Sequence, residues 1–113
     1  MGYTLYNQII QTHYGGDLYK GVPIYTSPIL RMHSFVFSKA SGKAIYTDGG
    51  TGTFDNLKSP LISYAGSSIG KYIGAYYYNG HIAEIIFYTR ALSNKERQEV
   101  ELYLSKKWGI KIG

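Results

Sequence analysis

Residues 78–109 read YNGHIAEIIFYTRALSNKERQEVELYLSKKWG, and this stretch joins a strand pattern to a helix pattern. Its first part, residues 82–89, is apolar and β-branched or aromatic at both odd and even positions. Such a run predicts a central strand that is covered on both faces inside a sandwich. The dipeptide Asn79-Gly80 in front of it is a favoured type I′ turn pair. We therefore expect a tight turn that leads into a buried strand.

The second part of the stretch predicts a helix that begins after Ser93. Ser93 is a good N-cap residue, and Glu96, three positions later, completes a capping box. Gly109 suits the left-handed position beyond the last turn, and Lys106 and Lys107 suit the negative end of the helix dipole. Apolar side chains recur at helical spacing and predict the face that packs on the sheet, with Trp108 in the core and two isoleucines packing back after the helix: Val100, Tyr103, Leu104, Trp108, Ile110 and Ile112.

Upstream of this stretch, the chain predicts further strands separated by turns. The clearest is a hairpin in which residues 32–38 pair with residues 44–48 across a turn at residues 40–43. The remaining strand patterns lie at residues 3–12, 22–25, 61–64 and 71–78, whereas residues 13–17 read as a turn and residues 49–56 as a loop. The fold class that we predict is all-β: an antiparallel sandwich with one short C-terminal helix, formed by residues 1–113 as a single domain.

Composition excludes several classes of function. The chain has no cysteine, which excludes disulfides, thiolate catalysis and Cys-based zinc sites. The net charge is +5, but the basic residues are scattered singly, which favours a solvated surface over a nucleic-acid site. The N-terminus has no signal-peptide pattern, and no run approaches the ~20 apolar residues of a membrane span. We therefore expect neither a nucleic-acid partner nor a membrane span.

The C-terminal stretch resembles the end of the concanavalin A-like lectin/glucanase domains, laminin-G-like in the broad sense. The likeness consists of a Gly-x-Ile-x-Glu strand, an Arg-Ala-Leu-Ser corner and a Glu-Arg-x-x-Val-x-x-Tyr-Leu helix that closes in Trp-Gly, at residues 80–84, 90–93, 96–104 and 108–109. The predicted hairpin is similar to the family's central hairpin. The resemblance implies a jelly-roll sandwich of two antiparallel sheets. Because it covers only the later half of such a domain, we expect a sandwich short of strands, whose open edges partner chains cover.

Glu84 lies within the apolar strand pattern, and some members of the wider superfamily are glucanases. A glycosidase needs two carboxylates that flank the scissile bond. Glu84 has no second carboxylate two or four positions away, so we expect it to pair with Arg90 or to accept hydrogen bonds from the strand-to-helix corner. The three histidines are dispersed and poorly accompanied by acids, which argues against a metal cluster. The chain is therefore predicted not to be an enzyme.

Two groups of residues are candidates for contact with a glycan, because sugars stack on flat aromatic rings and bond their hydroxyls to carboxylates and amides. One group follows the hairpin and the other lies in the strand pattern of residues 71–78: Asp48, Asp55 and Asn56, then Tyr72, Tyr76 and Tyr78. We expect no cofactor. The alternative is a calcium ion, because calcium binds oxygen ligands of the kind that the first group offers. The structural alternative is that the acids make turns and the tyrosines pack across a sheet.

Two classes of function follow from these patterns. The first is a non-catalytic structural or attachment module, such as a virion or cell-surface component of a larger assembly, and its alternative is a carbohydrate-binding lectin module. Tyrosine is enriched at interfaces, and the chain has 13 tyrosines in 113 residues. Residues 3–12 carry no charge and no proline to protect an edge strand, so we expect them at a contact with a second copy or a larger protein. The extracellular or virion surface is the setting that these features favour.

Overall fold

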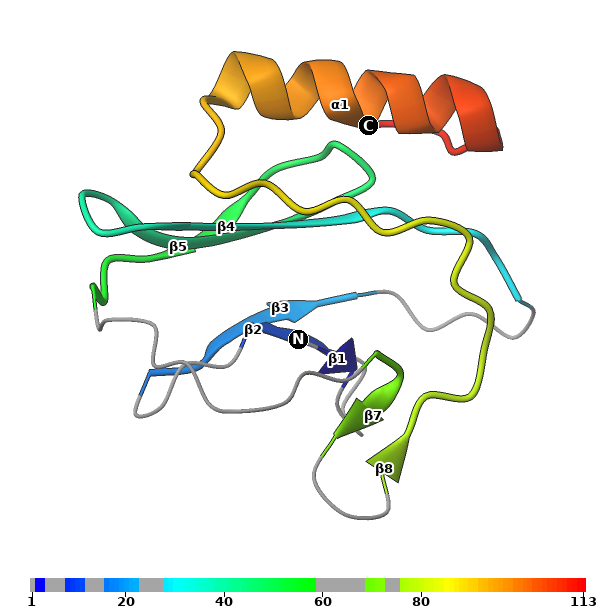
Figure 1. Cartoon of the computed structure of the whole chain (residues 1–113), viewed down its shortest axis with the longest axis horizontal. Coiled ribbons are helices and arrows are strands. Elements are labelled where there is room, and N and C mark those ends of the chain that lie inside the picture. Colours follow the sequence, from blue (N-terminus) through cyan, green and yellow to red (C-terminus); the bar gives the residue numbers. More distant parts are fainter. Residues whose placement is uncertain (1, 4–7, 12–15, 23–27, 59–68, 73–75) are drawn as a thin grey trace.

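The computed structural model describes residues 2–3, 8–11, 16–22, 28–58, 69–72 and 76–113. The strands within these ranges form three antiparallel sheets, and one helix, α1, lies over the central sheet (Figure 1). The layers in Figure 1 run from α1 through the sheet that holds β4 and β5 to the sheet of β1 to β3. The strand-rich part of the fold prediction is confirmed, as is the C-terminal helix.

The central sheet contains β4 (His33–Ser38), β5 (Gly42–Thr47) and β6 (Thr53–Asp55), in that order. Phe35 of β4 pairs with Ile45 of β5, and the predicted hairpin is confirmed. Its turn is shorter than the predicted residues 40–43, because Gly42 and Lys43 belong to β5. Gly42 has a positive φ of 85°, and a Cβ there would collide with the Asp55 carbonyl oxygen, so the turn requires glycine. Residues 49–56 were expected to be a loop, but β6 forms within them. The sequence pattern does not predict β6, because the strand is only three residues long and follows a glycine-rich stretch.

The second sheet shows that the N-terminal strand prediction is wrong. Residues 3–12 do not form one strand, because β1 (Gly2–Tyr3) turns back and pairs antiparallel with β2 (Gln8–Gln11). The third strand, β3 (Leu18–Gly21), pairs with β2. The strand expected at residues 22–25 lies outside the described residues except for Val22, which is in no strand. Period-two patterning alone does not reveal a reversal inside an uninterrupted β-rich run.

The third sheet corrects a similar error. Residues 71–78 form two short strands, β7 (Lys71–Tyr72) and β8 (Tyr76–Tyr77), which pair with each other. Gly74 lies inside the run in the sequence, and glycine weakens a continuous strand. The strand predicted at residues 61–64 and most of the turn at residues 13–17 lie outside the described residues.

The two larger sheets are held together by a small apolar core and by lysines. Leu18 of β3 packs on Ile45 of β5, which is completely buried, and Val22 and Phe35 flank this contact. The ammonium group of Lys43 is buried as well; it donates to the Gly16 carbonyl and lies 3.6 Å from a carboxylate oxygen of Asp55. These groups satisfy a buried charge that would otherwise be costly.

The predicted helix boundaries are confirmed. Helix α1 spans Asn94–Trp108, Ser93 is its N-cap, and both hydrogen bonds of the capping box with Glu96 are present. Gly109 adopts the left-handed conformation with φ of 68°, and its N–H donates to the Ser105 carbonyl. Lys106 and Lys107 lie in the last turn, near the negative end of the helix dipole.

The face of α1 that packs on the central sheet is charged. Arg97 and Glu101 are the buried residues of the helix, with exposed fractions of 6% and 2%. One guanidinium nitrogen of Arg97 donates to Glu101, and the hydroxyl of Ser34 in β4 donates to the same carboxylate at 2.6 Å. The guanidinium also lies 3.6 Å from the ring centre of Tyr46 in β5. A buried, stacked ion pair therefore joins the helix to the sheet.

The predicted apolar face of the helix is only partly correct. Val100 and Leu104 are half-buried, whereas Tyr103 and Trp108 are exposed, so the prediction that Trp108 lies in the core is wrong. Trp108 lies on the same side of the helix as Arg97 and Glu101, because it follows Arg97 by eleven residues, or about three turns. Its exposure therefore goes with its place at the last residue of α1 and not with the rotation of the helix. After the helix, Ile110 is buried as expected, but Ile112 is exposed.

We predict that replacing Glu101 with alanine destabilises the fold by about 3–5 kcal/mol, because it leaves Arg97 buried without its carboxylate. Urea denaturation measures the free energy of unfolding, and Glu99→Ala on the exposed side of the same helix is the control, expected within about 0.5 kcal/mol of the unchanged chain. The double variant Arg97→Met/Glu101→Leu should recover most of the loss, because no unpaired charge remains. A loss below about 1 kcal/mol in Glu101→Ala would show that the pair does not hold the helix.

Candidate functional site

Residues 81–90, called here the extended segment, contradict the prediction of a buried central strand. Every residue of the segment is exposed, including five large hydrophobic side chains, of which Phe87 is 75% exposed: Ile82, Ile85, Ile86, Phe87 and Tyr88. Among the described residues, no main-chain hydrogen bond joins the segment to a strand. The segment therefore has the composition of an interior strand without a neighbouring strand in the described fold.

The first attachment of the extended segment, the Glu84 clamp, lies at the C-terminal end of α1. The Nε1 of Trp108 donates to the Glu84 carboxylate at 2.7 Å, and the Nζ of Lys107 lies 3.0 Å from the same oxygen. The hydrogen bond from Trp108, followed by that from Lys107, lowers the pKa of Glu84. The expected pairing of Glu84 with Arg90 is wrong, because Glu84 reaches the far end of the helix.

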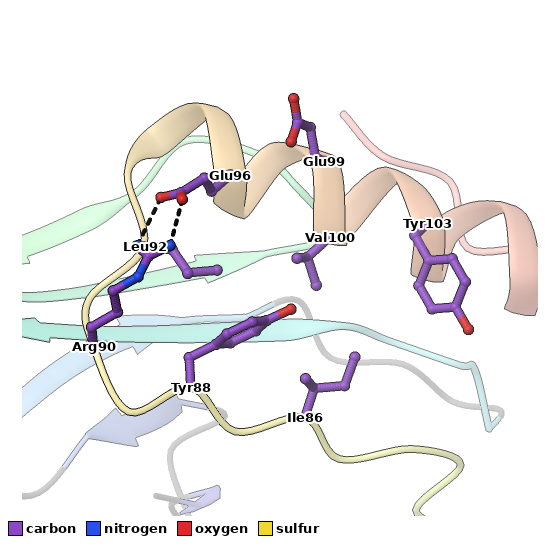
Figure 2. Close-up of a pocket in the computed structure, with 8 residues that line it drawn as sticks. All are labelled: Ile86, Tyr88, Arg90, Leu92, Glu96, Glu99, Val100 and Tyr103. Carbon is purple, nitrogen blue, oxygen red and sulfur yellow. Dashed lines mark hydrogen bonds and ion pairs between the residues drawn. The ribbon is translucent and has the colours of Figure 1, made fainter.

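The second attachment, the Arg90 clamp, lies at the N-terminal end of α1. Two guanidinium nitrogens of Arg90 donate to the two carboxylate oxygens of Glu96, at 3.0 Å and 2.6 Å (Figure 2). Glu96 also accepts hydrogen bonds from the amide and the hydroxyl of Ser93, each at 2.8 Å. Arg90 first, and Ser93 after it, lower the pKa of Glu96 to about 2. The glutamate of the capping box therefore also fastens the extended segment.

The spacing of the two clamps matches the geometry of a strand beside a helix. From residue 84 to residue 90 an extended chain covers about 20 Å. From residue 96 to residue 107 an α-helix covers about 17 Å. Since residue 84 contacts residues 107 and 108 and residue 90 contacts residue 96, the segment runs antiparallel to α1. The clamps thus hold the segment straight along the helix.

A groove of about 410 Å³ separates the extended segment from α1. Even-numbered side chains line one wall and helix side chains line the other (Figure 2): Ile86, Tyr88, Arg90 and Leu92, then Glu96, Glu99, Val100 and Tyr103. Because strand side chains alternate, Ile85 and Phe87 project from the opposite face of the segment. One face of the segment borders a half-apolar groove and the other is open to solvent.

The acidic candidates for ligand binding hold turns in the structure. Asp48, at a positive φ of 49°, accepts from the Met32 amide at 2.9 Å and pairs with Arg31 at 3.1 Å. Asp55 accepts from the Leu57 amide at 2.8 Å, in addition to its ion pair with a buried lysine. Asp55 pairs with the first half of β5 and Asp48 follows its last residue, which places them about 16 Å apart. Asn56, next to Asp55, is exposed.

The tyrosine candidates lie on a different sheet. Tyr72 and Tyr76 are register partners in the β7–β8 pair, and their side chains lie outside the described part of the chain. Tyr78 is exposed, and its amide donates to the Gly70 carbonyl at 2.8 Å. Because the side chains of Tyr72 and Tyr76 are not described, a glycan site that uses these tyrosines and the acidic candidates stays a prediction.

Two further findings limit what the site holds. No group of three or more His, Asp or Glu side chains suited to a metal ion occurs in the ranges that the structure describes. Among those same residues, no helix is both long and apolar enough to cross a lipid bilayer.

Sequence reasoning missed the groove and its two tyrosines, Tyr88 and Tyr103. The signal was present in part, because side chains at alternate positions of an extended chain share one face, which groups the even-numbered residues 82–90. Comparison with known proteins gives no match to any protein-family model, curated protein or solved structure. The function is therefore argued from the geometry of the site.

His33 lies beside Asp48 and reports on the same corner of the central sheet. Its Nδ1 is 3.3 Å from the Thr47 hydroxyl. Burial lowers the pKa of His33 to about 4, partly opposed by the Asp48 carboxylate and reinforced by Arg31. A group whose pKa falls on folding contributes stability above its unfolded pKa of ~6.5 and loses it as the pH falls towards the folded value.

We predict that the free energy of unfolding drops by about 2–3 kcal/mol as the pH falls from about 6.5 to about 4, because only unfolded His33 takes up a proton in that range. Urea denaturation at a series of pH values measures the drop. His33→Gln should remove most of it, whereas the exposed His81→Gln should leave it unchanged. An identical drop in His33→Gln would mean that other groups cause it.

Proposed function

We propose that this chain is a non-catalytic structural or attachment module that associates with other protein chains, built on a jelly-roll sandwich of the concanavalin A-like type that is short of strands. The observation that carries the proposal is the extended segment: an interior-type strand held straight by two clamps and exposed along its whole length. A strand of this kind is a template for pairing with another chain.

The charges at the site favour binding over catalysis. Hydrolysis of a glycosidic bond needs a carboxylic acid with a raised pKa beside a second carboxylate. The pKa values of Glu84 and Glu96 are both lowered, since each is engaged by cationic or N–H donors. Glu99 is the other carboxylate of the groove. Among the described residues that line the groove, it has no neighbouring carboxylic acid with a raised pKa. We therefore propose a module that binds without turnover, in a larger assembly such as a virion or cell surface.

A second candidate function is a lectin that binds a glycan in the groove. Tyr88 and Tyr103 are both about half exposed and come from opposite walls of the groove, and flat aromatic rings are what sugars stack on. A glycan array with the folded chain separates the two functions, because specific binding that Tyr103→Ala abolishes would favour the lectin.

We predict that Phe87→Lys prevents the chain from joining its larger assembly, because the lysine places a charge on the exposed strand face. Co-sedimentation with that assembly in about 1 M NaCl, where the Debye length is about 3 Å, isolates apolar association from surface electrostatics. Ile69→Lys, at a position 66% exposed outside the segment, is the matched control and should join normally. If Phe87→Lys co-sediments as well as the control, the segment is not the contact.

A further inference from the structure

We propose that the partner of the extended segment is a second copy of this chain, with the segments of two copies paired as antiparallel strands about a two-fold axis. The inference rests on the proposed function and names its partner. The result would be one continuous two-stranded ribbon across two protomers. Both α1 helices would lie on the same face of it, because a two-fold axis perpendicular to the plane of the ribbon maps each face onto itself.

The clamps prepare the segment for this pairing. Association normally costs the ordering of the backbone that pairs. Here the bidentate Arg90–Glu96 contact and the two bonds to Glu84 already hold the backbone straight. The main-chain groups between the clamps make no hydrogen bond to a strand among the described residues. A second strand can therefore pair with a backbone that is already ordered.

The charge of the segment is compatible with an identical partner. Its only charged residues are Glu84 and Arg90, and each is neutralised within its own chain by Lys107 and Glu96 respectively. The segment consequently presents no free charge that would select an acidic or basic protein. Two copies placed side by side would likewise meet no opposed like charges, which would destabilise the pairing.

The sequence of the segment is self-complementary in an antiparallel register. A two-fold axis through a strand pair sets one residue opposite itself, and the central position is Ile85. Around it Ala83 lies opposite Phe87, which combines a small side chain with the most exposed large one. Ile82 then lies opposite Tyr88, a β-branched and aromatic pair of the kind that stabilises sheets.

The absence of cysteine from the chain makes the pairing directly testable. Residues opposite each other in an antiparallel pair have Cα atoms about 4.5–5.5 Å apart, which suits a disulfide. Under mild oxidation, Ile85→Cys should form a covalent dimer at least about tenfold faster than Ile69→Cys, because pairing raises the effective thiol concentration. A mixture of Ala83→Cys and Phe87→Cys should cross-link between the two variants and not within either one.

Sedimentation of the unsubstituted chain at micromolar concentration completes the test. We expect a dimer that persists in high salt and that Phe87→Lys dissociates. Cross-linking of Ile85→Cys no faster than Ile69→Cys, or a dimer that Phe87→Lys leaves intact, would overturn the inference. A monomer that still loses its larger assembly through Phe87→Lys would overturn the self-pairing and leave the proposed function standing. A monomer whose association with that assembly is unaffected would overturn both.

Discussion

The arrangement of the C-terminal half depends on the buried ion pair between Arg97 and Glu101. Two charges removed from water are stable only when each finds several partners. Ser34 and the ring of Tyr46, from adjacent strands, add contacts to the pair and thereby orient α1 on the central sheet. The Nε of Arg97 is buried without a hydrogen-bond partner in the described part of the chain. A smooth apolar face would tolerate small rotations of the helix, whereas this polar network permits one orientation.

The orientation of α1 determines where its two ends lie, and both ends hold the extended segment. At the start of the helix, Glu96 is shared between the capping box and Arg90. At the end of the helix, the exposed residues Trp108 and Lys107 contact Glu84. The helix that buries an ion pair against the sheet therefore also holds the exposed extended segment through residues at its two ends. Helix α1 therefore connects the core to the surface that we propose for association.

Local patterns in the sequence predicted the elements whose determinants are local. The capping box at Ser93, the left-handed Gly109 and the β4–β5 hairpin depend on residues close in the chain, and all three are confirmed. The docking face of the helix depends instead on whether a distant hydroxyl and ring can satisfy a buried charge, and periodicity of apolar residues does not register that. Burial of the extended segment similarly depends on neighbouring strands. A run of isoleucine and aromatic residues predicts such neighbours, but the run alone does not determine whether they are there. The groove tyrosines were missed for this reason.

The central claim is that the extended segment is rigid and straight in the single chain while its main-chain groups make no hydrogen bond to a strand of the described ranges. Nuclear magnetic resonance of the dilute, isotopically labelled chain measures both properties residue by residue. The account predicts order parameters near 0.85 for residues 84–90, as in rigid backbone, together with rapid hydrogen exchange of the same amides. Order parameters below about 0.6, or amides protected from exchange in the dilute monomer, would contradict it.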